Sequence, residues 1–159
     1  MLPPLCGRPI RVEVRASLGR HLAAASIPKR LILLDAEVLA GRGEFERILV
    51  HEIFHFAWRR LSNERRRSWE RIVRAEIQHR ATGDLGWSAE WRKRKLQPND
   101  LRRRTIAWRH YACESFCDTA AWLYSGLRKH EEFTLSPRFR RPRRDWFESA
   151  FPASQAIPI

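Results

Sequence analysis

The sequence predicts an α+β fold, in which a small N-terminal sheet is followed by three long helices in one compact domain. A chain of 159 residues has the size of one domain, and its 43% of apolar residues suffice for a core. Alternation of apolar and polar residues, which is typical of strands, is confined to the first part of the chain, and helical periodicity dominates the rest. No apolar run approaches the roughly 20 residues of a membrane-spanning helix, so we expect no membrane contact.

Two strands and a short helix are expected at the start of the chain. Residues 10–16 alternate between apolar and polar side chains, which indicates a half-buried strand. Residues 30–35 are mostly apolar, so we expect a strand that is buried on both faces. Between them, Ser17 is suited to cap a short helix that runs through Ala25 and ends near Pro28.

Three long helices are expected next. Glycines within residues 41–43 break the chain before the first helix, over about residues 44–61. The second helix, over about residues 64–80, keeps apolar side chains at helical spacing, and the third runs from about residue 100 to residue 127.

The remaining segments are expected to be irregular or exposed. Residues 82–99 contain two glycines and a proline, and we expect Trp87 and Trp91 to anchor this loop to the core rather than to line a cleft. Residues 128–159 form a basic C-terminal segment. Its arginines within residues 138–144 are expected on the surface, and its last residues are expected to be frayed.

The first long helix contains an H-E-x-x-H motif, formed by His51, Glu52 and His55. Residues four apart share a helix face, so the two imidazoles can point at one metal ion while the glutamate handles a proton on a water. The surrounding residues are strongly apolar, and burying these three polar side chains without strong partners would be costly. A metal ion, with zinc as the default, is therefore favoured over two hydrogen-bonded core histidines.

A third ligand is expected on the third helix. Glu114 is the best choice, and Asp118, four residues later on the same face, could accept a hydrogen bond from a ligand histidine. The neighbouring residues are small or apolar, so a solvated face does not explain two carboxylates. Asp118 itself, His79 and Glu76 are the other choices for the ligand.

Cys113 and Cys117 also lie one helical turn apart, and thiolates bind zinc well. Together with His110 they could form a structural site instead. Free cysteine is among the most buried residue types, so we interpret both as core residues.

The H-E-x-x-H motif followed by E-x-x-x-D on a later helix resembles the gluzincin clan of zinc metallopeptidases, and in its compact size the chain is most similar to the minigluzincins. The resemblance implies a zincin-like fold and a metalloendopeptidase that hydrolyses peptide bonds with one catalytic zinc ion. By motif, His51, His55 and Glu114 would bind zinc, Glu52 would be the general base, and Asp118 would orient a ligand histidine.

The resemblance covers roughly residues 30–127 and departs from the clan in one respect. The separation between His55 and Glu114 is longer than in its compact members, so residues 62–99 are interpreted as an insertion. Bacterial regulatory metallopeptidases that cleave repressors share the same pattern and are a close alternative.

Two further features of a peptidase are expected. Tyr111 and His110 lie about one turn before Glu114 and are possible donors to the oxyanion that forms during hydrolysis. Residues 30–35 are the natural choice for a strand that binds an extended peptide substrate.

The net charge of +13 comes almost entirely from arginine and favours attraction to nucleic acid or another acidic partner. The net charge is also compatible with a different function, in which the chain is an inactive zincin-like scaffold that binds nucleic acid or protein. Three cysteines and no recognisable export signal lead us to expect a cytoplasmic location. The oligomeric state is not predicted.

Overall fold

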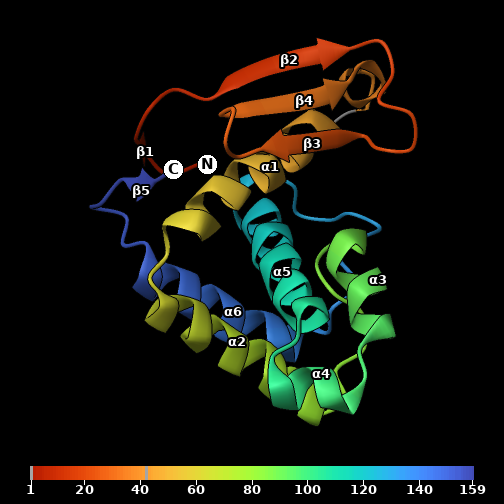
Figure 1. Ribbon diagram of the computed structural model, residues 1–159, viewed down its shortest axis with the longest axis vertical. Coiled ribbons are helices and arrows are strands. Elements are labelled where there is room, and N and C mark those ends of the chain that lie inside the picture. Colours follow the sequence, from red (N-terminus) through yellow and green to blue (C-terminus); the bar gives the residue numbers. More distant parts are fainter. Residues whose placement is uncertain (1, 42) are drawn as a thin grey trace.

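A three-stranded sheet lies at one end of a set of packed helices in the computed structural model, which describes residues 2–41 and 43–159 (Figure 1). The fold is α+β, as expected. The elements, in chain order, are β1 (Leu5–Cys6), β2 (Arg11–Arg15), β3 (Ala23–Ser26), β4 (Leu31–Asp35), the short 3-10 helix η1 (Ala36–Leu39), α1 (Glu44–Arg60), α2 (Asn63–Gln78), α3 (Trp87–Lys95), α4 (Pro98–Arg103), α5 (Ile106–Tyr124), α6 (Pro137–Ala150) and β5 (Ile157–Pro158).

The sheet has the strand order β2-β4-β3, so β4 is central. Strand β4 is parallel to β2 and antiparallel to β3. Both strands predicted from the sequence are confirmed, but β2 is not half-buried as expected, because its Val12 and Val14 side chains are exposed. The apolar side chains of β4 explain its place, because Ile32 and Leu34 are fully buried against Ile48 and Phe56 of α1. The sheet therefore packs directly on the helix that carries the H-E-x-x-H motif.

The helix expected over residues 17–25 is wrong, since this segment contains the edge strand β3. Its alanines have high helix propensity, but pairing with β4 outweighs that local preference. The Asp35 carboxylate holds the preceding loop in place by accepting hydrogen bonds from the backbone N–H groups of Leu18 (2.7 Å) and Glu37 (3.0 Å). Because β4 is paired on both sides, residues 30–35 cannot add a substrate strand, and that expectation is wrong as well.

Helix α5 runs through the middle of the helical part, with α1 at one end, α2 and α6 along one flank and α3 along the other (Figure 1). A cluster of aromatic side chains fills the space between α1, α2, α5 and α6, and Phe54, Trp69, Phe116 and Phe147 are fully buried in it. No helix of the described residues is long and apolar enough to cross a membrane.

The helix expected over residues 100–127 is divided into α4 and α5. The break lies at Arg104, whose φ of 49° is left-handed, and at Thr105, whose hydroxyl accepts a hydrogen bond from the Trp108 N–H and so caps α5. The segment 82–99 is also more regular than expected, because it contains all of α3.

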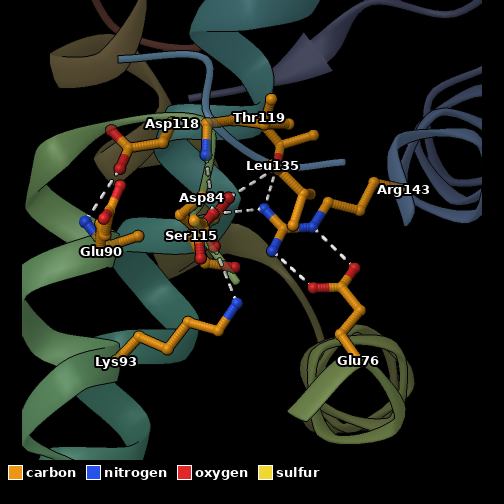
Figure 2. Close-up of polar contacts among 12 residues, drawn as sticks. Glu76, Asp84, Glu90, Lys93, Ser115, Asp118, Thr119, Leu135 and Arg143 are labelled. Atoms are coloured by element: carbon orange, nitrogen blue, oxygen red, sulfur yellow. Dashed lines mark hydrogen bonds and ion pairs between the residues drawn. The ribbon is translucent and has the colours of Figure 1, made fainter. Parts of the chain in front are cut away.

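The C-terminal segment is more deeply buried than its charge suggests. Arg143 of α6 is fully buried and lies between Glu76 of α2 and Asp84 (Figure 2). The end of the chain is likewise fixed, because β5 pairs with β1 in parallel and Ile157 is fully buried. The expectations of a surface segment and a frayed end are therefore wrong for these residues.

Candidate metal centre

The two histidines of the H-E-x-x-H motif on α1 face α5, where His51 meets Glu114 and His55 meets Cys113. The two imidazoles point their Nε2 atoms at each other, 3.2 Å apart. One carboxylate oxygen of Glu114 lies 3.3 Å from the Nε2 atom of His51. This convergence follows from the packing of α1 on α5, which is the most extensive contact between elements of the fold.

These separations match the geometry that zinc requires. For zinc–nitrogen and zinc–oxygen bonds of roughly 2.0–2.1 Å, two ligands at tetrahedral positions lie about 3.3–3.4 Å apart. The separations of 3.2 and 3.3 Å that involve His51 are close to this edge length. Two nitrogen donors and one oxygen donor also suit the chemistry of zinc. His51 therefore lies at the spacing of zinc ligands from both His55 and Glu114.

The opposite ring nitrogens are held by residues of α5. The Nδ1 atom of His51 lies 2.7 Å from the carboxylate of Asp118, whose other oxygen accepts a hydrogen bond from the N–H of Ala89 at 2.9 Å. The Nδ1 atom of His55 lies 3.5 Å from the sulfur of Cys113. Such contacts fix the ring orientation and leave Nε2 free to bind a metal.

The charged groups of the centre shift the pKa values of His51 and Glu114. Burial disfavours a charged imidazole, but the charge and hydrogen bond of Asp118 raise the pKa of His51 well above its ordinary value. Burial would raise the pKa of Glu114, but the hydrogen bond and charge of His51 lower it to about 2. The Glu114 carboxylate is thus held ionised beside the histidines, with Arg92 3.3 Å from its other oxygen, and a metal ion would add to the positive charge that balances it.

Cys117 offers a second solution for the third ligand. Ligand atoms of His51, His55 and Cys117 all lie within 4.8 Å of one another, so this group could hold a metal ion. Cys117 is fully buried, and burial raises the pKa of its thiol, whereas Glu114 lines a cavity. A catalytic zinc needs a position open to water. Glu114 therefore suits a catalytic centre, and Cys117 suits a closed structural one.

A groove passes over the centre, and we call it the α1 groove. It consists of two adjoining cavities of about 230 and 290 Å³. The two cavities share five lining residues: His21, Ala23, His51, Glu52 and Ser88. Glu52 is only 8% exposed, and it lines both halves. The motif glutamate therefore stands beside the histidines at the floor of the groove.

Strand β3 forms one wall of the α1 groove. Ala23, Ala24 and Ala25 line its larger half, and β3 is the edge strand on that side of the sheet. Leu22 accepts a hydrogen bond from the N–H of Asp35, so in an antiparallel pair residues 22, 24 and 26 face β4. The backbone groups of Ala23 and Ala25 consequently point to the open edge.

Both residues that the sequence suggested as oxyanion donors lie elsewhere. Tyr111 is fully buried, and its hydroxyl donates to Asp84 at 3.2 Å. His110 is exposed and lines neither half of the α1 groove. Both residues lie close to Glu114 along α5. Their side chains, however, project from other faces of the helix and do not reach the groove.

Glu76 and His79, the alternative ligands expected from the sequence, have partners outside the centre. Glu76 is buried in a two-bond ion pair with Arg143. His79 is exposed and bonds the backbone oxygen of Ala75. Neither lines the groove.

Three residues at the groove were not predicted from the sequence. His21 lines both halves, and Trp87 and Trp91 line the smaller half. The two tryptophans are 40% and 57% exposed, so the expectation that they anchor a loop to the core is wrong. Their W-x-x-x-W spacing was the available signal, because residues four apart stack on one face once the segment is a helix.

Comparisons of the chain with models of known protein families, with curated proteins and with solved structures find no match. The interpretation of the centre therefore rests on its residues and their geometry.

Proposed function

We propose that the chain is a zinc-dependent peptidase of the zincin type, with His51, His55 and Glu114 as metal ligands. One observation carries the proposal: the Nε2 atom of His51 lies 3.2 Å from that of His55 and 3.3 Å from an oxygen of Glu114, on the floor of an open groove with Glu52 beside them. A bound zinc ion would supply a water of lowered pKa and would polarise the scissile carbonyl.

Glu52 handles the proton in this scheme. Its carboxylate is held on α1 next to both ligand histidines and reaches both halves of the α1 groove. It accepts the proton of the attacking water and later delivers it to the leaving amine. Asp118 acts indirectly, because it contacts the ligand His51 and fixes the orientation of its ring.

His21 replaces the two donors suggested by the sequence. It lies in the loop before β3, across the groove from α1, and lines both cavities. An imidazole N–H at that place can donate to the oxyanion. If it does, His21→Ala lowers kcat by more than it raises KM and leaves zinc content unchanged. Equal zinc content with unchanged kcat would remove His21 from the mechanism.

The open edge of β3 supports an extended peptide as the substrate. The backbone groups of Ala23 and Ala25 can pair with a substrate strand, and their small side chains leave room for it. This arrangement lays the peptide over Glu52 along the length of the groove.

The first test is the metal content of protein purified without added metal. We expect about one zinc per chain. It should be lost in Glu114→Ala and kept in both Glu52→Gln and Cys117→Ala. Loss in Cys117→Ala, together with a thiolate charge-transfer band after cobalt substitution, would instead indicate the closed site of His51, His55 and Cys117. Zinc-free native protein would remove the proposal.

The second test is turnover. Zinc-loaded native protein should cleave members of a broad peptide library, and Glu52→Gln should not, although it keeps its zinc. Zinc binding without any cleavage would favour an inactive scaffold over a peptidase.

A second function, binding of single-stranded nucleic acid, is favoured by a different place in the fold. Two cavities of about 540 and 390 Å³ meet at Trp122, and Arg140 and Arg144 line both. The guanidinium of Arg144 lies 5.0 Å from the centroid of the Trp122 ring. Arginines around an aromatic ring are typical of surfaces that hold phosphates and stack bases.

Binding of a labelled oligonucleotide tests this second function. Affinity should fall steeply with added salt and should drop on Trp122→Ala, whereas Ile106→Ala, which shortens an exposed side chain elsewhere, should have no effect. Equal binding by the Trp122→Ala and native proteins would mean that the net charge acts without a defined site.

A further inference from the structure

Three exposed large apolar side chains lie together at one end of the α1 groove. Seven large apolar side chains of the described residues are exposed, and three of them, Leu22, Trp87 and Trp91, line its smaller half. Single exposed apolar residues are common, but a group beside a concave site indicates a surface that binds an apolar ligand. The other four, Val12, Val14, Leu39 and Ile106, line neither half of the groove.

The two tryptophans form a preorganised surface. Their rings are stacked, with centroids 6.1 Å apart and an angle of 17° between the planes. The start of α3 is held by the backbone N–H of Trp87, which donates to Glu132 at 2.9 Å, and by that of Ala89, which donates to Asp118. Because Asp118 also holds His51, the tryptophans are fixed relative to the proposed metal centre.

The anchoring of α3 does not depend on the tryptophan rings. Ala89 is fully buried and Glu90 nearly so, whereas both rings remain substantially exposed. The two rings contribute little to the core and lie beside Glu52 in a cavity. Contact with a bound ligand explains this exposed position better than packing does.

The carboxylates at this end of the groove are already occupied. Glu132 pairs with Arg47 at 2.8 Å, and Asp118 is bound to His51 and Ala89. Apart from Glu52, this half therefore offers no free anion to a basic substrate side chain, and Arg20 at its edge adds positive charge. An aromatic or large aliphatic side chain fits this surface better than lysine or arginine does.

We propose that Leu22, Trp87 and Trp91 form a specificity subsite that selects peptides with an aromatic or large aliphatic side chain near the scissile bond. This inference rests on the proposed peptidase function and names its substrate class. A substrate strand along β3 carries alternate side chains to one side, and one of these would lie against the tryptophan rings while the adjacent peptide bond lies over Glu52.

Peptide binding without turnover gives the first test. The probes are labelled alanine-based peptides that differ at one position (Phe, Leu, Lys or Ala), and the protein is zinc-loaded Glu52→Gln, which holds but does not cleave them. We expect the Phe and Leu peptides to bind roughly ten- to a hundred-fold more tightly than the Ala peptide. The advantage should disappear when Trp87→Ala and Trp91→Ala are added, and should persist with Ile106→Ala.

Cleavage mapping by mass spectrometry gives the second test and separates the two proposals. Native zinc-loaded protein should cut a peptide library with aromatic or large aliphatic residues enriched at one position beside the cut. The variant with both tryptophans replaced should lose this enrichment while it keeps its zinc and still cuts other sites. Cleavage without the enrichment, an equal enrichment in the variant, or a preference for lysine overturns the subsite alone. An absence of any cleavage counts against the peptidase function, whereas selective binding of the Phe peptide would still support the subsite.

Discussion

Replacement of Arg143 by methionine should destabilise the protein strongly. The side chain is fully buried and donates two hydrogen bonds to Glu76, at 2.8 and 2.6 Å, one to Asp84 at 2.6 Å and one to Thr119 at 3.1 Å (Figure 2). Burial opposes its charge, but the two carboxylates raise the pKa of Arg143 well above its ordinary value. Methionine fills part of the same space but carries no charge, so it leaves both buried carboxylates without the guanidinium that pairs with them.

The magnitude follows from the cost of an unpaired buried charge. Removing one partner of a buried ion pair costs about 3–5 kcal/mol of unfolding free energy. With an unfolding entropy of roughly 2.1 cal/mol/K per residue, a chain of 159 residues has about 0.33 kcal/mol/K. The expected fall in Tm is therefore roughly 9–15 °C, which circular dichroism at neutral pH can measure.

Restoring neutrality separates charge from packing. If the loss arises from the two unpaired carboxylates, adding Glu76→Gln and Asp84→Asn to Arg143→Met should recover much of the lost stability. A fall below about 3 °C for Arg143→Met, which corresponds to roughly 1 kcal/mol, would refute the reasoning. So would a triple variant that is less stable than the single one.

Three further outcomes are expected. Asp118→Asn should weaken zinc affinity roughly 10- to 100-fold in competition with a chromophoric chelator, because His51 loses its orienting carboxylate; an unchanged affinity would show that Asp118 does not orient the ligand. Gly86→Ala should weaken zinc affinity in the same assay and lower the Tm, because its new Cβ would lie 2.2–2.4 Å from the Asp118 carboxylate atoms; native affinity there would mean that the carboxylate moves freely. Glu70→Gln should cost about 1.5–3 kcal/mol in urea unfolding at pH 7. Burial alone would raise the pKa of Glu70, but its bonds to Arg104 lower it. The difference in unfolding free energy between the native protein and Glu70→Gln should therefore shrink as the pH falls below the ordinary pKa of 4.5. A difference that stays constant with pH would contradict a stabilising ion pair between Glu70 and Arg104.

Local sequence patterns located the centre but did not define the groove. The four-residue spacing within His51–His55 and within Glu114–Asp118 puts each pair on one face of its own helix, whatever the rest of the fold does. That the two faces meet depends on the packing of α1 on α5, and the roles of these residues in binding zinc stay predictions. Tyr111 shows how far spacing along a helix can predict a site. It lies close to Glu114 along α5, as expected, but its side chain points to Asp84 and not to the groove.

The sequence by itself determined the α+β class, the strands β2 and β4, and the helices α1 and α2, because each has a periodic pattern or an end signal within a short window. The tertiary structure decided which partner each segment met. An alanine-rich segment became the edge strand β3 because β4 offered it a hydrogen-bonding partner. An arginine in a basic run became fully buried because Glu76 and Asp84, distant in sequence, met it in the core. Exposed rings came to lie beside Glu52 because α3 packs on α5. These outcomes depend on contacts between residues far apart in the chain, and no local pattern encodes them.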